Sequence, residues 1–173
     1  MRGRSMKLLV TYDGSPASTA AFPVARKLSQ ATAAEVVLLR VFRPPLGLVA
    51  HPDAEHREAQ LQAIERSYLD ELQQSAKSIG EEVRPIVRRL GQRWNLVDEI
   101  LAVATEFGAD FICMATHGES AFRHFVVGST ALDVLSKSPC PVVLVRSDLP
   151  AGAGKQEHSD QEAHRQNPAG PAS

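Results

Sequence analysis

Hydrophobic residues along the chain gather in five short continuous runs, and segments with helical periodicity separate these runs. The runs are rich in Val, Ile and Leu and lie between Gly- and Pro-containing turns, which is typical of strands buried on both faces of a parallel sheet. They span Lys7–Tyr12, Glu35–Phe42, Val83–Leu90, Phe111–Ala115 and Val142–Val145. Pro85 lies inside the third run. Because proline cannot donate to a ladder, it favours a sheet edge or the beginning of that strand.

The segments between the runs carry apolar residues three and four positions apart, as amphipathic helices do. They predict helices from Pro16 to about Gln30, from about Glu55 to Gly80, from Trp94 or Asn95 to Phe107, and from Ser129 to Pro139. Ser15 is a good N-cap for the first helix, and Gly108 closes the third. Strands that alternate with helices predict an α/β fold, a single open doubly wound five-stranded parallel sheet with helices on both faces.

The composition divides the chain into a domain and a tail. Residues 1–146 hold all of the predicted elements, whereas residues 147–173 consist largely of Gly, Pro, Ala, Ser, Gln and His with almost no large apolar side chain. A segment of that composition cannot bury enough apolar surface to offset the entropy of ordering it. We therefore expect a domain over 1–146 and a disordered tail over 147–173.

Charge and length exclude several classes of protein. The net charge of -1 argues against a nucleic-acid binder, which usually carries a basic face. No run approaches the roughly 18 apolar residues of a membrane span, and the apolar stretch near the N-terminus is too short for a signal peptide. Cys113 and Cys140 fit no disulfide or zinc pattern, so we expect two buried thiols. These features favour a cytoplasmic protein that has no membrane partner.

The loop after the fourth run is the clearest candidate for a binding site. Thr116, His117 and Gly118 follow the run, nine residues separate Gly118 from Gly128, and Ser129 and Thr130 begin the next helix. A strand, a glycine loop and a helix N-terminus in this order place free backbone N–H groups where a phosphate can bind. The hydroxyls of Ser129 and Thr130 can cap the helix or contact a phosphate. The alternative is that Gly128 and Ser129 only begin a helix.

Other strand ends supply the remaining candidates, because ligands of such sheets bind at the carboxyl ends of strands where the strand order reverses. Asp13 follows the first run, where it is either an ordinary turn residue or a ligand to ribose hydroxyls or Mg²⁺. Val41 lies at the end of the second. His117 either donates to a phosphate or bonds to the backbone. The six histidines have no metal-ligand spacing, so we expect no metal site made by the protein alone.

These motifs together resemble the universal stress protein family. The family's signature is Gly, two residues, Gly, nine residues, Gly, then Ser or Thr, and here Ala115, Gly118, Gly128 and Ser129 occupy it. The resemblance extends from about Met6 to Arg146 and includes three further motifs, Asp13-Gly14-Ser15, Gly108-Ala109-Asp110 and Pro139-Cys140-Pro141-Val142.

The resemblance implies the strand order 3-2-1-4-5, a homodimer through the fifth strand, and a site for ATP or ADP with Mg. It places Asp13 near the ribose or the metal, Val41 beside the adenine, Met114 and Ala115 at the base and ribose, and Gly118, Gly128, Ser129 and Thr130 at the phosphates. Ala115 departs from the signature glycine. Its methyl group would either crowd the ribose or be absorbed by a small shift.

Three functions remain open on the sequence alone. The first is an ATP- or ADP-binding sensor in the stress response. The second is a nucleotide-free dimeric interaction protein in which Ala115 blocks the site. The third is an enzyme, at most a slow ATPase, because neither a base partner for Ser129 nor a charge clamp for phosphoryl transfer is evident.

Overall fold

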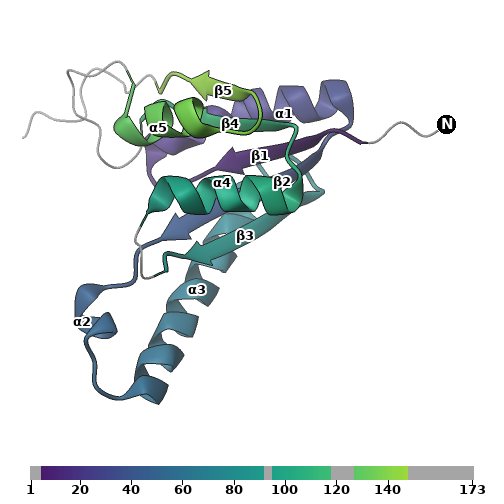
Figure 1. Ribbon diagram of the computed structural model, residues 1–173. Coiled ribbons are helices and arrows are strands. Elements are labelled where there is room, and N and C mark those ends of the chain that lie inside the picture. The colour runs from purple at the N-terminus through teal and green to yellow at the C-terminus, as the bar shows by residue number, and fades with distance from the viewer. Residues whose placement is uncertain (1–4, 92–94, 118–126, 148–173) are drawn as a thin grey trace, which may run out of the picture.

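Five strands form one parallel sheet in the computed structural model, which describes residues 5–91, 95–117 and 127–147. The strands are β1 (Lys7–Thr11), β2 (Glu35–Phe42), β3 (Val83–Arg89), β4 (Phe111–Ala115) and β5 (Val142–Val145). Their order is β3-β2-β1-β4-β5, so the predicted fold class and strand order are confirmed (Figure 1). The expected tail from residue 148 onward lies outside the described residues.

The helices follow the predicted pattern with three differences, the first of which is that the helix expected from Pro16 begins as a separate 3₁₀ helix. The helices are the 3₁₀ helix η1 (Pro16–Ala20), α1 (Ala21–Thr32), α2 (Leu46–Val49), α3 (Ala54–Ala76), α4 (Leu96–Phe107) and α5 (Ser129–Lys137). The short helix α2 lies in a stretch with no helical periodicity. Helix α3 ends before Gly80, because tight backbone turns after Ala76 bring Ile79 into the core, where it is 1% exposed.

The helix caps agree with the sequence. Ser15 accepts a hydrogen bond from the Ser18 N–H at the start of η1, and Asn95 caps α4 in the same way. Gly108 ends α4 at a φ of 68°, in the left-handed conformation that glycine adopts without strain. No described helix is both long and apolar enough to span a bilayer.

The helices cover both faces of the sheet, as predicted (Figure 1). On one face, Leu8, Val10 and Leu38 pack against α1 and α3. On the other face, Leu9 and Leu39 pack against α4 and α5. Successive strand residues therefore alternate between two apolar clusters. Burial on both faces explains why the strands are continuous apolar runs rather than alternating ones.

The two edges of the sheet differ in chemistry. Strand β3 forms one edge and contains Pro85 together with Arg84, Arg88 and Arg89. Arg89 pairs with Glu58 and Glu65 of α3, and Arg88 pairs with Glu106 of α4. Strand β5 forms the other edge and consists of four apolar, half-buried residues.

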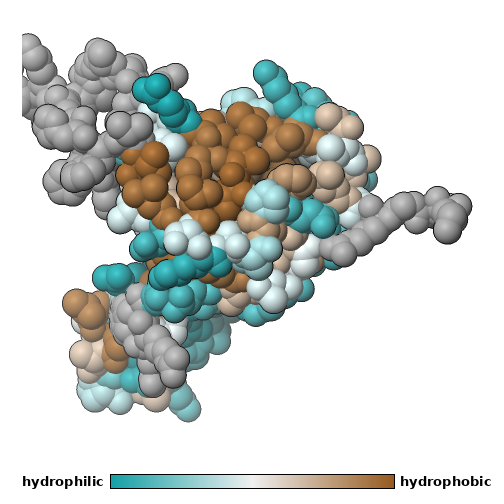
Figure 2. All heavy atoms as spheres, turned by 45° about the horizontal axis from the view of Figure 1, so that its top comes forward, coloured by the Kyte–Doolittle hydropathy of each residue, from teal (hydrophilic) through white to brown (hydrophobic). Residues whose placement is uncertain are grey.

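An apolar surface continues from β5 onto α5. Leu132 and Leu135 of α5 are 49% and 48% exposed. Figure 2 shows apolar side chains gathered over the side of the molecule that carries β5 and α5. Apolar side chains that are gathered in one place, rather than scattered singly, mark a candidate interface.

The two cysteines differ in environment and should differ in reactivity. Cys113 is fully buried, and burial raises its pKa to about 12. Cys140 is only half-buried, so the expectation of two buried thiols is correct for Cys113 alone. Because the thiolate is the reactive form, Cys140 should react at pH 8 with 5,5′-dithiobis(2-nitrobenzoate) at least about tenfold faster than Cys113. Both thiols should react in denaturant. Equal rates in the native protein would contradict this prediction.

Candidate functional site

A cleft of about 760 Å³ opens at the carboxyl ends of β1, β2 and β4. The chain leaves β1 toward the face covered by α1, and it leaves β4 toward the face covered by α5. The neighbouring connections therefore diverge between β1 and β4, the switch point at which open α/β sheets bind ligands. The volume falls within the range of small-molecule sites, roughly 300–1,000 Å³.

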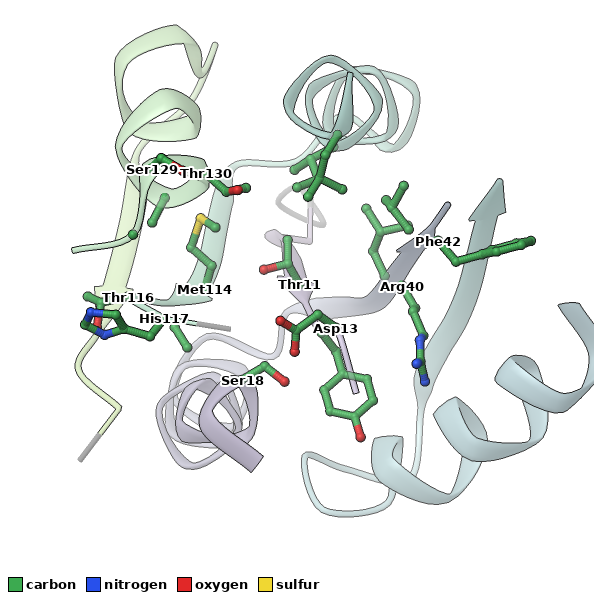
Figure 3. A pocket seen from close by; sticks show the side chains of 18 of the residues that line it. Thr11, Asp13, Ser18, Arg40, Phe42, Met114, Thr116, His117, Ser129 and Thr130 are labelled. Carbon is green, nitrogen blue, oxygen red and sulfur yellow. The ribbon is translucent and has the colours of Figure 1, made fainter. Parts of the chain in front are cut away.

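The N-terminus of α5 forms one end of this cleft. Gly128 is its N-cap residue, and among the described residues no side chain forms a cap hydrogen bond there. Ser129 and Thr130, the first two residues of the helix, line the cleft (Figure 3). The positive end of the helix thus faces the cleft, which is the arrangement that binds anions.

Gly128 is placed by a close backbone contact. Its N–H donates to the Thr116 carbonyl at 2.7 Å, which ties α5 to the end of β4. A Cβ on Gly128 would lie 3.0 Å from that same carbonyl oxygen. The backbone at Gly128 is ordinary, with φ at −68° and ψ at 153°. A side chain here would push the two backbones apart by a few tenths of an ångström, so glycine is favoured by this close approach and not by its conformational freedom.

Asp13 lies in the middle of the cleft, and it is a turn residue as well. One carboxylate oxygen accepts the Ser15 N–H at 2.9 Å and the Ser15 hydroxyl at 2.7 Å. Figure 3 shows the carboxylate between Thr11 and Ser18, with its oxygens turned toward the side of the cleft that carries Met114 and His117. Ser15, rather than Asp13, caps the following helix. The two roles weighed from the sequence are compatible, because the turn orients the carboxylate within the cleft.

Val41 presents its backbone to the cleft. The ladder between β1 and β2 ends at the pair Thr11–Leu39, and the Tyr12 N–H makes the last bond to the Leu39 carbonyl at 2.9 Å. Backbone groups of alternate strand residues point to the same side, so the N–H and C=O of Val41 point as those of Leu39 do. Because β1 has turned away by then, these two groups face the cleft.

The end of β4 supplies the other predicted residues. Met114, Ala115 and His117 all line the cleft, and Ala115 is 7% exposed. His117 Nδ1 lies 3.1 Å from the Thr116 hydroxyl and 3.3 Å from the Ser147 hydroxyl. Of the residues proposed from the sequence, only Gly118 lies outside the described ranges.

Sequence reasoning missed Arg40. Its side chain is only 10% exposed, lines the cleft and pairs with Glu71 of α3 at 2.6 Å. Its guanidinium lies 3.9 Å from the centre of the Tyr68 ring. Glu71 also accepts the Tyr12 hydroxyl at 3.0 Å, and burial raises the pKa of Tyr12, which keeps that hydroxyl a donor. The sequence signal that could have identified Arg40 is its position as a cation within the largely apolar eight-residue run that forms β2.

The described residues contain no cluster of three or more His, Cys, Asp and Glu side chains that could hold a metal ion. A metal would therefore need ligands from a bound molecule as well as from the protein. Mg²⁺ commonly binds in this way, through one or two carboxylates and the phosphates of a substrate.

Comparison with known proteins agrees with this fold. The profile of the universal stress protein family matches residues 5–146. A universal stress protein of Thermus aquaticus, encoded in the QAH/OAS sulfhydrylase 3′ region, is 30% identical over 139 residues, which are 80% of this chain and 97% of that protein.

Solved structures share the architecture. Universal stress protein UspA from Lactobacillus plantarum superposes with a TM-score of 0.61 at 22% identity, over 84% of this chain and 100% of the other. A universal stress protein from Archaeoglobus fulgidus, solved in complex with dAMP, gives 0.55 at 20% identity, over 81% and 97% of the two chains. At these identities the likeness concerns the fold.

Proposed function

The chain belongs to the universal stress protein family, and from that premise we propose that it binds an adenine nucleotide, ATP or ADP, in the cleft at the carboxyl edge of its sheet. The observation that carries the proposal is the pairing of two features within one cleft. One is the N-terminus of α5, which lacks a side-chain cap, and the other is the backbone of Val41. The first suits phosphates and the second suits a base.

The base end has the hydrogen-bonding pattern of an adenine site. Adenine offers an acceptor, N1, beside a donor, the N6 amino group. A strand residue whose N–H and C=O both face the ligand, as those of Val41 do, can bond to both atoms in the plane of the base. Leu39, Ile100 and Met114 line the cleft around this point and supply apolar contact for the ring.

The phosphate end would hold the charged part of the ligand. Gly128, Ser129 and Thr130 line the cleft there, and His117 lies on the neighbouring strand end. Asp13, between the two ends, would contact the ribose or hold Mg²⁺ together with the phosphates, because Mg²⁺ prefers oxygen ligands. The bound metal would neutralise phosphate charge. Its site would therefore form with the nucleotide rather than before it.

The proposal favours a sensor over an enzyme. Phosphoryl transfer depends on groups that position the nucleophile and neutralise charge at the γ-phosphate. Among the described residues, the buried cation that lines the cleft, Arg40, is paired with Glu71 on the side remote from α5 (Figure 3). Ligand binding would then act by shifting the populations of conformational or assembly states. We place this activity in the stress response and in the cytoplasm, where thiols such as Cys113 and Cys140 stay reduced.

Nucleotide content tests the proposal directly. The purified protein would be denatured, its supernatant resolved by anion exchange, and the emptied protein titrated with Mg-ATP by calorimetry. We expect retained ATP or ADP, or binding to about one site per chain. A protein that holds no nucleotide and binds none would overturn the proposal. If Ala115→Gly then restored binding, the methyl group of Ala115 would be the block, and the nucleotide-free interaction protein would be the better account.

We also propose that the protein is a homodimer through β5. An unpaired apolar edge strand is an aggregation risk unless another strand or a partner covers it. Val143→Lys places a charge in the middle of this edge, so sedimentation should show the mass of one chain instead of two. The matched control is Leu46→Lys, where the native side chain is 75% exposed and belongs to α2, a helix that lies far from β5 in Figure 1. An unchanged mass for Val143→Lys, with native circular dichroism, would exclude this interface.

A further inference from the structure

The buried Arg40 connects three elements at one wall of the cleft. From β2 its guanidinium pairs with Glu71 and stacks on Tyr68, and both of these residues belong to α3. Tyr12, the residue after β1, donates its hydroxyl to the second oxygen of Glu71. Tyr12, Arg40 and Tyr68 all line the cleft. In the Arg40–Glu71 pair, the arginine side chain is almost fully shielded from water. Hydrogen bonds between charged groups are stronger in such an environment than at a surface.

The same guanidinium supports the turn that carries Asp13. Gly14 has a φ of 94°, and a Cβ built on it would lie 2.6 Å from Nη2 of Arg40 and 3.0 Å from Cζ. The guanidinium therefore fills the space directly behind the Gly14 backbone. On the other side of the turn, the Asp13 carboxylate is held by the N–H and hydroxyl of Ser15. The turn is thus fixed from both sides.

We infer that Arg40 is a positioning residue of the nucleotide site: it holds the Asp13–Gly14 turn against α3 so that the Asp13 carboxylate faces the ribose hydroxyls. The inference rests on the proposed function. It assigns the discrimination between ribose and deoxyribose to a residue that need not contact the sugar. Without the guanidinium, the Gly14 backbone loses its support, and the Asp13 carboxylate is no longer held at a fixed distance from the ribose hydroxyls.

A ribose-specific readout separates positioning from general stability. Mg-ATP, Mg-2′-deoxy-ATP and Mg-3′-deoxy-ATP would be titrated into the wild-type chain, Asp13→Asn and Arg40→Gln by calorimetry. Removing the hydroxyl that donates a hydrogen bond to a carboxylate lowers the affinity for the ligand about tenfold. We expect the wild type to prefer ATP over at least one deoxy analogue by about that factor. In both variants the preference should fall to about twofold or less.

Arg89→Gln is the matched control. Arg89 is also a strand arginine paired with glutamates of α3, yet it does not line the cleft. Its loss should leave the ribose preference intact even if it lowers stability. Arg40→Lys should recover part of the preference, because an ammonium group can still pair with Glu71. If Arg40→Gln folds poorly, Tyr68→Leu removes the ring under the guanidinium without changing charge and should also reduce the preference.

The outcomes distinguish this inference from the function it rests on. A wild-type chain that binds no nucleotide removes both. Three outcomes overturn the inference alone. The first is binding without any preference for the ribose, and the second is a full preference retained in folded Arg40→Gln. The third is a full preference retained in both of the folded single variants Arg40→Lys and Tyr68→Leu. Loss of the preference in Arg89→Gln as strongly as in Arg40→Gln would also overturn it, because the effect would then follow from loosening α3.

Discussion

Replacing Gly128 by Val should weaken Mg-ATP binding about thirty- to a hundredfold, which corresponds to roughly 2–3 kcal/mol of binding free energy. A Cβ at this position lies 3.0 Å from the Thr116 carbonyl oxygen, and the two methyl groups of Val extend further. This carbonyl belongs to the backbone at the end of a paired strand, so it cannot move aside as a flexible side chain would. We therefore expect Gly128 to shift, which lengthens its 2.7 Å hydrogen bond to the Thr116 carbonyl and moves the N-terminus of α5 from its place in the cleft.

The Gly128 substitution isolates this contact because the backbone there has ordinary angles that valine adopts readily. Gly47→Val is the control, since a Cβ on Gly47 meets no atom within 4 Å and the residue lies outside the cleft. Calorimetry with Mg-ATP measures both. Unchanged affinity in Gly128→Val would show that the start of α5 does not hold the phosphates.

Replacing Leu38 by Ala should lower the free energy of unfolding by about 2–5 kcal/mol, a large part of the total stability of an ordinary domain. Leu38 is 0% exposed in the middle of β2, and it packs in the cluster that joins β1 and β2 to α1 and α3. The loss combines the transfer of apolar surface with the cavity that remains, since neighbouring strands cannot close it fully. Urea unfolding followed by circular dichroism measures the change.

The control for Leu38 is Leu46→Ala, which removes the same atoms from a side chain that is 75% exposed. Its effect should stay within about 0.5 kcal/mol. A decrease in the urea midpoint with an unchanged slope is expected for Leu38→Ala, because the surface exposed on unfolding hardly changes. Equal effects of the two substitutions would mean that this cluster is not the core.

Strands proved more predictable than helix ends. β2, β4 and β5 have the predicted bounds, and β1 and β3 each end one residue early. Burial on both faces leaves strands as uninterrupted apolar runs, and these are easy to delimit. The end of α3 was missed because Gly80 is a good stop signal in isolation. The packing of Ile79, which is a tertiary contact, ends the helix sooner.

The residues of the candidate site that could be predicted are those whose position follows from neighbouring sequence. Gly128, Ser129 and Thr130 follow from the order of strand, loop and helix, and the structure brings them into one cleft with Asp13, Val41 and Met114. Arg40 could not be assigned in this way. Its partners Tyr68 and Glu71 lie about thirty positions away in the sequence, and only the packing of α3 on β2 shows that the cation is neutralised rather than misplaced in a buried strand.

The contrast between the two sheet edges limits how copies of this chain can assemble. A filament requires two different surfaces to join head to tail, so that the edge of one copy accepts the opposite edge of the next. Here that contact would bring the apolar β5 edge against β3, where Pro85 lacks a donor and three arginines carry charge. If copies associate through β5, as we propose, the pairing of β5 with β5 is favoured over this mismatched contact, and a pair formed in that way is closed. In such a dimer the arginines of β3 would disfavour polymerisation through this contact, while Arg88 and Arg89 also pair with glutamates of α4 and α3.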